Sequence, residues 1–311
     1  MRRRIVPAAW KLLVFGLGYF VVMFFGHLPD HLILFPTRSP IDAGAAARRT
    51  IPFENGDLEI WTAQSQSARQ RGRADVYILR FYGNADRADR WPAMEAELWM
   101  DRAVEIWGMN YPGFGGSTGP ARLARIGPAA VAAFDELRRQ AANKSAGESA
   151  VPSGPTPSSA LRTAQHTAPI VLFGTSIGAT AALHVAASRP TEIAGLILQN
   201  PPPLREMILR QFGWWNLWLL AGPVVLQLPR DLDSIANAKT SRAPAIFLLA
   251  ERDEIVAPRF HRLVVQAYAG EKRIIELRGA HHNDPVEGSA LVDLNDGIGW
   301  MLTKATSSRA P

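Results

Sequence analysis

The 311-residue sequence predicts an α/β protein with a mostly parallel central sheet, helices on both faces of the sheet, and an N-terminal transmembrane helix before it. Three observations predict this fold class. Short apolar runs alternate with helical stretches along most of the chain, which is typical of a parallel sheet. Most of these runs are continuously apolar, as expected for strands that are covered on both faces. A separate apolar stretch follows an arginine cluster at the N-terminus.

The N-terminal apolar stretch runs from Trp10 to Leu28 and follows three arginines at positions 2–4. It is close to the roughly 20 residues that a membrane span requires. A cleaved signal peptide and a buried core helix are the alternatives. No small-residue cleavage site follows promptly, so we expect an uncleaved anchor over residues 1–31. Because basic residues precede the span, we expect a single-pass membrane protein whose main domain lies outside the cytoplasm, on the periplasmic side in a bacterium.

Residues 32–311 are expected to form the main domain. It opens with IPFENGDLEIWTA, which predicts a hairpin turning at Asn55-Gly56 between antiparallel edge strands. The sheet strands that follow are expected at residues 76–82, 103–110, 169–174, 193–200, 244–250 and 272–278. The helices between and after them are expected around residues 88–102, 128–142, 179–188, 259–269 and 290–304.

Two segments interrupt this alternation. Residues 141–168 are rich in alanine, serine, proline and glycine and predict a flexible surface insertion. Residues 201–240 are strongly apolar and include Trp214, Trp215 and Trp218. This second segment is interpreted as a small cap that forms an acyl pocket or contacts a membrane, with plain packing against the sheet as the alternative.

Composition excludes several classes of function. The apolar content of 47% and the charged content of 20% are those of an ordinary globular chain. The absence of cysteine excludes disulfides, thiolate metal sites and cysteine nucleophiles. The net charge of +6 is spread over many arginines with no basic run that interleaves aromatics, so nucleic acid is not an expected partner. The oligomeric state is not indicated.

The pattern G-x-S-x-G occurs twice, around Ser117 and around Ser176. A nucleophilic serine in this pattern needs a strand that runs into a tight turn and then a helix. Ser176 has this context, because IVLFG precedes it and GATAALHVAAS follows it. Ser117 is followed by Pro120, and no helical pattern resumes until about Pro128. The context therefore predicts Ser176 as the nucleophile.

A serine nucleophile needs a base and an orienting acid, and in this class the chain order is serine, acid, histidine. Asp253 follows the strand at 244–250, at the sheet edge where sites form in open α/β sheets. Glu251 and Glu254 are the rival acids. We prefer Asp253, because the segment ERDEIV resembles the turn in which such enzymes place their acid.

The candidate bases follow the last strand, where His281 and His282 are adjacent, so at most one of them points into the site. His184 and His261 lie in predicted helices and are poorer candidates.

Four motifs carry a family resemblance: FPTR (35–38), FYGNAD (81–86), NYPGFGGSTG (110–119) and AHHND (280–284). On these motifs the chain resembles the membrane-anchored serine hydrolases of the α/β-hydrolase superfamily, the branch with lysophospholipase-like and depalmitoylase-like enzymes. The resemblance covers roughly residue 32 to the C-terminus, apart from residues 141–168. FYGNAD is similar to that family's HGNAG oxyanion loop, with Tyr82 in place of histidine. NYPGFGGSTG is similar to its YRGYGxSxG loop, with Pro112 in place of arginine. AHHND is similar to its GHND loop, which implies that His282 is the catalytic histidine.

The resemblance implies a mechanism. Ser176 attacks an acyl carbonyl, His282 accepts its proton and Asp253 holds the imidazole. The backbone N–H groups of Ile177 and Asn84 form the oxyanion hole, with Ala85 as the alternative donor to Asn84. No metal and no cofactor are expected.

The expected activity is hydrolysis of carboxylic esters, of lipid or long-chain acyl type, through an acyl-enzyme. The expected partners are a small-molecule or lipid ester and, through the N-terminal helix, a membrane. A serine peptidase or thioesterase is one alternative. A catalytically idle, membrane-tethered binding module of the same fold is the other.

Overall fold

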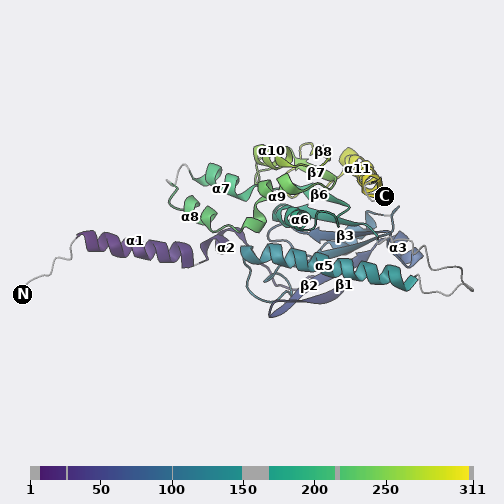
Figure 1. The fold of residues 1–311 in the computed structure, drawn as a ribbon, viewed down its shortest axis with the longest axis horizontal. Helices are drawn as coiled ribbons and strands as arrows, with labels where there is room; N and C mark the ends of the chain where they lie inside the picture. Colours follow the sequence, from purple (N-terminus) through teal and green to yellow (C-terminus); the bar gives the residue numbers. More distant parts are fainter. Residues whose placement is uncertain (1–7, 26, 100, 149–167, 214–217, 308–311) are drawn as a thin grey trace, which may run out of the picture.

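A computed structural model describes residues 8–25, 27–99, 101–148, 168–213 and 218–307. Its centre is an eight-stranded sheet in the order β1-β2-β4-β3-β5-β6-β7-β8 (Figure 1). Strands β4, β3, β5, β6, β7 and β8 run parallel, whereas β1 and β2 are antiparallel to their neighbours. The predicted α/β class with a mostly parallel sheet is confirmed. The strands are β1 (Ala47–Phe53), β2 (Gly56–Gln64), β3 (Val76–Phe81), β4 (Val104–Met109), β5 (Ile170–Thr175), β6 (Gly195–Gln199), β7 (Ala245–Ala250) and β8 (Lys272–Leu277).

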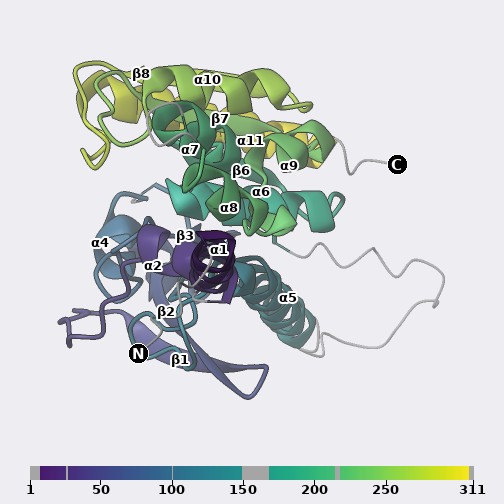
Figure 2. The same cartoon turned by 90° about the vertical axis from the view of Figure 1, so that its left-hand side faces the viewer.

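Helices cover both faces of the sheet and form two apolar cores. On one face α5, α6 and α10 pack against the strands, with α9 packed on α6 and α10, and on the other face α4 and α11 do so (Figure 2). The short helices α7 and α8 lie beyond the end of the sheet opposite α3 (Figure 1). The helices are α1 (Ala8–Phe25), α2 (Leu28–Ile33), α3 (Gln66–Arg71), α4 (Pro92–Glu97), α5 (Leu123–Glu148), α6 (Ile177–Ser188), α7 (Leu204–Phe212), α8 (Ala221–Leu226), the 3-10 helix η1 (Arg230–Leu232), α9 (Ser234–Thr240), α10 (Pro258–Ala267) and α11 (Gly288–Ser307).

The expected hairpin is present, because β1 and β2 pair from Phe53 and Gly56 outward, around a turn in which Glu54 has φ 51°. Of these two strands only β1 lies at an edge of the sheet, since β2 also pairs with β4. The prediction that both strands lie at an edge is therefore wrong for β2.

Two expected helices have other bounds. The helix expected around residues 88–102 is the six-residue α4. α5 begins at Leu123 instead of Pro128, so the proline lies about one turn inside the helix, where it removes only one intrahelical hydrogen bond. α5 also continues to Glu148, through the start of the predicted insertion, and Ala141 there is fully buried. The remainder of the predicted insertion, apart from Ala168, lies outside the described residues.

The prediction of an N-terminal membrane span is wrong. Among the residues that the structure describes, no helix is long and apolar enough to cross a membrane. α1 has 18 residues and includes Lys11, so its uncharged part begins only at Leu12, short of the roughly 20 apolar residues that a span needs. The single-pass, extracytoplasmic location that depended on this span is withdrawn with it. α1 instead contacts α8, where the Gln227 side chain donates to the Met23 carbonyl oxygen at 2.7 Å and the Tyr19 hydroxyl donates to the Leu219 carbonyl oxygen.

Candidate active site

Ser176 lies in the turn between β5 and α6, with φ 53° and ψ −125°. A non-glycine residue at such a positive φ is strained, and strain of this kind gathers at functional sites. The turn is held in place because the Ser176 N–H donates to the Gln199 carbonyl oxygen of β6 at 2.8 Å. The strand, turn and helix expected around this serine are therefore all present.

The two glycines of the Ser176 motif are required by close packing. A Cβ on Gly178 would lie 2.2 Å from the Phe81 carbonyl oxygen, on the neighbouring strand β3. A Cβ on Gly174 would lie 2.4 Å from the carbonyl oxygen of Gly178. Any larger residue at either position would push α6 away from the sheet and move the serine.

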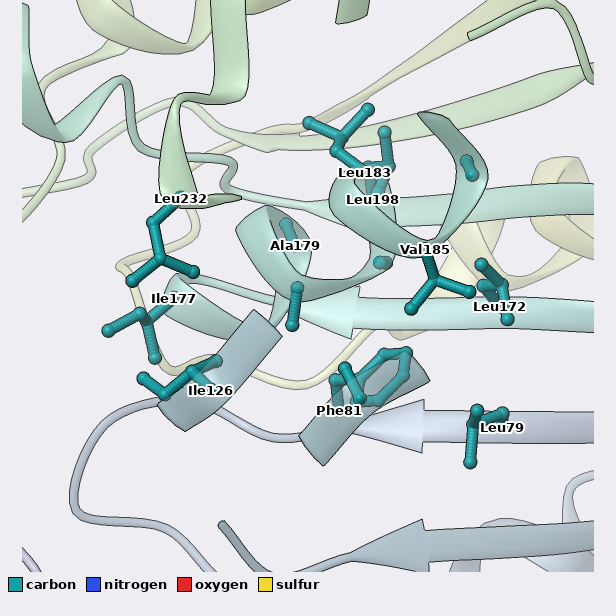
Figure 3. Close-up of a cluster of buried hydrophobic side chains, with 14 of the residues drawn as sticks. Leu79, Phe81, Ile126, Leu172, Ile177, Ala179, Leu183, Val185, Leu198 and Leu232 are labelled. Atoms are coloured by element: carbon teal, nitrogen blue, oxygen red, sulfur yellow. The ribbon is translucent and has the colours of Figure 1, made fainter. Parts of the chain in front are cut away.

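Packing also fixes the first turn of α6. Ile177 lies beside Ile126 of α5 and Leu232 of η1, and all three side chains are buried (Figure 3). Because Ile177 is the first residue of α6, its N–H has no partner within the helix. Among the described residues it makes no other backbone hydrogen bond, so it can donate to an anion beside Ser176.

Asp253 and His282 meet at the same edge of the sheet, after β7 and β8. Oδ2 of Asp253 lies 2.6 Å from Nδ1 of His282, and both side chains are buried. Oδ1 accepts from the backbone N–H groups of Ile255 at 2.9 Å and Val256 at 2.7 Å. Within the described residues no hydrogen bond joins the Ser176 hydroxyl to the His282 ring, and in unliganded enzymes such a contact often forms only with substrate.

The charge state of Asp253 follows from its contacts. Burial raises the pKa of the Asp253 carboxyl. Contacts with the imidazoles of His261 and His282 and with the N–H of Val256 outweigh burial and hold the pKa well below its usual range. The carboxylate therefore stays ionised at neutral pH.

The rival residues have other partners. Glu251 accepts the N–H of Gly279 at 2.7 Å and is exposed. Glu254 is also exposed and lies 3.1 Å from Nδ1 of His281. The structure thus separates the two histidines: His282 contacts the buried Asp253, and His281 contacts an exposed carboxylate.

The FYGNAD loop lies against the Ser176 turn. A Cβ built on Gly83 would be 3.7 Å from the Cβ of Ser176. The Ala85 N–H already donates to Oδ1 of Asn84 at 3.0 Å. The Asn84 side chain also accepts the N–H of Phe35 at 2.9 Å and donates to the Ile33 carbonyl oxygen, so it ties the loop to the end of α2 and the residues that follow it.

Tyr82, which stands where the resembling family has histidine, is a structural link in this loop. Its hydroxyl donates to Glu95 of α4 at 3.0 Å, and the Arg80 guanidinium lies 4.5 Å from its ring centre. Burial and the nearby Glu95 carboxylate raise the pKa of Tyr82 well above its usual value, so the phenol stays neutral.

The second G-x-S-x-G pattern forms a packed loop. The Ser117 hydroxyl accepts the N–H of Glu59 at 2.8 Å and donates to the Asn110 carbonyl oxygen at 2.7 Å. The buried Glu59 carboxylate accepts the N–H of Gly116 at 2.7 Å and contacts Arg48 at 2.6 Å. Burial raises the pKa of Glu59, but these contacts outweigh it and lower the pKa. Ser117 is thus fully occupied in holding the loop.

Sequence reasoning missed Asn200, which follows β6 and is fully buried at φ 49°. Its Nδ2 donates to the His282 carbonyl oxygen at 2.9 Å, and its Oδ1 accepts the N–H of Ala250 at 2.9 Å. One side chain therefore joins the ends of β6 and β7 to the loop that carries His282. One signal in the sequence could have indicated Asn200. It is a polar residue directly after an apolar strand, at the carboxyl edge of the sheet, where functional sites form.

Asn200→Ala is expected to lower the free energy of unfolding by about 2–4 kcal/mol, because two buried backbone groups lose their partners. The His282 loop loses its anchor as well. Urea unfolding of the wild type and the variant measures the effect. Gln199→Ala, whose side-chain hydrogen bonds to Thr175 and to the Asp284 carbonyl oxygen are longer, at 3.2 and 3.5 Å, should lose less stability. Equal stability of Asn200→Ala and the wild type would contradict the anchoring role.

Ser176, Asp253 and His282 are all buried. Arg205 holds the α7–α8 segment together by donating to the carbonyl oxygens of Val225 at 3.1 Å and Leu228 at 2.6 Å.

Across the described part of the chain, no three metal-ligating side chains gather into a site for a metal ion. A cavity of about 690 Å³ lies elsewhere, between β8 and α11.

Known proteins resemble this chain in sequence and in structure. No family model matches the chain. It is 29% identical to an uncharacterized protein of Mycobacterium tuberculosis. This match extends over 289 residues and covers 88% of this chain and 88% of the relative.

Solved structures are similar at low identity. An esterase of Pyrococcus furiosus matches with a TM-score of 0.55 and 14% identity, over 88% of this chain and 98% of the esterase. Est1E from Butyrivibrio proteoclasticus matches with a TM-score of 0.55 and 11% identity, over 83% of this chain and 99% of Est1E. The acylaminoacyl peptidase of Pyrococcus horikoshii has a TM-score of 0.56 and 14% identity, over 83% of this chain and 40% of the peptidase. These likenesses show a fold shared with α/β-hydrolase-fold esterases and peptidases.

Proposed function

We propose that this chain is a serine hydrolase that cleaves carboxylic esters through an acyl-enzyme, with Ser176 as nucleophile, His282 as base and Asp253 as orienting acid. One observation carries the proposal. The buried hydrogen bond between Asp253 and His282 stands at the same edge of the sheet as a serine at φ 53°. The three residues also occur in the chain order of this mechanism.

In the first half-reaction, the Ser176 oxygen bonds to the acyl carbon while its proton passes to Nε2 of His282. The imidazolium that forms is stabilised through Nδ1 by the ionised Asp253 carboxylate. His282 then gives the proton to the leaving alcohol. In the second half-reaction, a water molecule loses a proton to His282 and its oxygen bonds to the acyl carbon. The bond from that carbon to the Ser176 oxygen then breaks, the acid leaves, and His282 returns the proton to the serine oxygen.

The oxyanion of each tetrahedral intermediate would accept from the N–H groups of Ile177 and Asn84. The start of α6 supports the first donor, because that N–H has no partner within the helix. Asn84 is preferred over Ala85 as the second donor, because the Ala85 N–H is engaged by the Asn84 side chain. Each such donor is typically worth about 3 kcal/mol of transition-state stabilisation.

The proposed substrates are esters with a long apolar acyl chain. The support is the surface of α8 and the turn before it, where the large apolar side chains of Trp218, Leu219, Leu220 and Leu226 are exposed. α1 lies beside α8 and α2 (Figure 2). Most of its large apolar side chains are also exposed. An acyl chain that packs on this surface removes apolar area from water, at about 25 cal/mol per Å².

The proposal predicts that kcat/KM for p-nitrophenyl esters rises from acetate to octanoate. Each buried methylene contributes up to about 0.8 kcal/mol, so the rise from two carbons to eight should exceed tenfold. Matched acyl thioesters and anilides measured beside the esters test the thioesterase and peptidase alternatives. A fluorophosphonate probe, followed by peptide mass spectrometry, tests for modification at Ser176.

Two results would contradict the proposal. Absence of probe modification in the folded protein would leave the idle binding module as the better account. A preference for anilides over esters would assign the site to peptide chemistry. A flat chain-length profile with normal labelling would remove the acyl-surface argument alone.

A further inference from the structure

The catalytic acid of the proposed triad has a second histidine partner. His261 lies on α10, on the face that also carries Val264 and Val265, and its side chain is fully buried. Its Nε2 lies 3.1 Å from Oδ2 of Asp253, the same oxygen that contacts Nδ1 of His282 at 2.6 Å. One carboxylate oxygen is thus shared by two imidazoles.

Packing alone does not explain a histidine at this position. Among the described residues, neither ring nitrogen of His261 makes a hydrogen bond of standard alignment, although the Nε2 distance suits one. A buried polar group without a well-aligned partner costs free energy that an apolar residue of similar size would avoid. Helix α10 already buries apolar side chains on this face, so leucine would serve packing better.

Asp253 is the ionisable group that meets the ring directly, and His282 lies across it. Helix α10 packs against α9 and β7. The residues of β7 are all apolar, and Lys239, the ionisable residue of α9, is exposed. The neighbouring arginines of α10, Arg259 and Arg262, are exposed as well. The electrostatic effect of His261 in this part of the structure therefore falls on the carboxylate.

We propose that His261 is a positioning residue: its Nε2–H donates to Oδ2 of Asp253 and shares that oxygen with His282. The inference rests on the proposed triad. Sharing has two consequences. The carboxylate is held on both sides, by the N–H groups of Ile255 and Val256 at Oδ1 and by the two imidazoles at Oδ2. The second donor also weakens Oδ2 as an acceptor for the Nδ1–H of His282.

The test compares three variants on α10. His261→Leu removes the donor and keeps an apolar side chain of similar size. His261→Gln keeps an amide N–H in reach of Oδ2. Val265→Ala truncates a buried side chain of the same helix and serves as the control for general loosening. Thermal unfolding of each variant establishes that the measured protein is folded.

In His261→Leu, the acidic limb of the kcat/KM profile is expected to move about 0.5–1 pH unit upward, because Oδ2 becomes a stronger acceptor for His282. The kcat is expected to fall about threefold to tenfold with KM unchanged, since only the orientation of the triad is affected. His261→Gln should return the limb towards its wild-type position. Val265→Ala should lower the Tm and leave the limb in place.

An unmoved limb in His261→Leu, or an equal shift in Val265→Ala, would overturn the inference. The ring signals of His282 in the NMR spectrum of the free protein provide a readout that does not need turnover. Their titration midpoint should move upward in His261→Leu as the limb does, and an unchanged midpoint would also overturn the inference. Failure of the proposed hydrolase function is distinguished by the wild type, which would then not react with the fluorophosphonate probe.

Discussion

Ser176→Ala is expected to abolish ester hydrolysis, with a loss in kcat of about 10⁴-fold to 10⁶-fold, and to abolish labelling by a fluorophosphonate. The substitution removes the oxygen that forms the acyl-enzyme and changes little else, because the strained backbone at φ 53° is the same for alanine as for serine. Ser176 makes no side-chain cap to α6, so the helix keeps its hydrogen bonds. Circular dichroism and thermal unfolding of the variant should therefore match the wild type.

The second G-x-S-x-G serine provides a matched control. Ser117→Ala removes the partner of the buried Glu59 N–H and of the Asn110 carbonyl oxygen. We expect a loss of about 1–3 kcal/mol in the free energy of unfolding, with most of the specific activity retained in the folded protein. Equal loss of activity in both variants, with both folded, would mean that the wrong serine has been assigned.

The sheet was predictable because its signal is local. β3 and β7 are fully buried runs of mostly apolar residues, and continuous apolar runs of this length are typical of strands covered on both faces. The Ser176 turn was predictable for a similar reason, because the strand, the glycines and the helix are adjacent in sequence. Chain order and the rule that parallel strands end at one edge of the sheet placed the candidate acid and base after β7 and β8. The choice of Asp253 and of His282 within these loops came from the family resemblance.

The predictions that were wrong concern the start of α5 and the N-terminal helix, and both depend on tertiary contacts that the sequence does not display. The sequence pattern placed the start of α5 at about Pro128, but the helix begins at Leu123. Apolar composition predicted a membrane span at the N-terminus, but α1 is short and packs on α8. Whether a helix of this composition contacts its own chain is decided by tertiary packing.

The residues that sequence reasoning missed act across the fold. Asn200 bridges β7 and the His282 loop, which lie 50 and 82 positions further along the chain. His261 was set aside as a helical residue. Its spacing with Val264 and Val265 places it on the buried face of an amphipathic helix, and this was a usable signal. Helical spacing could not predict the contact between His261 and Asp253, because that contact depends on the conformation of the turn between β7 and α10.

His282→Ala is expected to lower kcat by about 10⁴-fold or more, since Ser176 then has no base and the Asp253 carboxylate no imidazole to orient. The loss should be in kcat with little change in KM, because the imidazole acts on the proton and not on the acyl chain. Protonation of His282 removes the base, so the wild type should lose activity in acid, and the variant should lack this limb. Steady-state kinetics of an octanoate ester over a range of pH measure both effects.

The adjacent histidine is the control for this prediction. The His281 side chain is 57% exposed and pairs with Glu254, which is equally exposed, so this pair contributes little in water. His281→Ala should retain kcat within about threefold and keep the acidic limb where it is. If His281→Ala were the more damaging of the two, the base would be His281. The buried contact between Asp253 and His282 would then serve the fold alone, and the assignment of His282 would have to be abandoned.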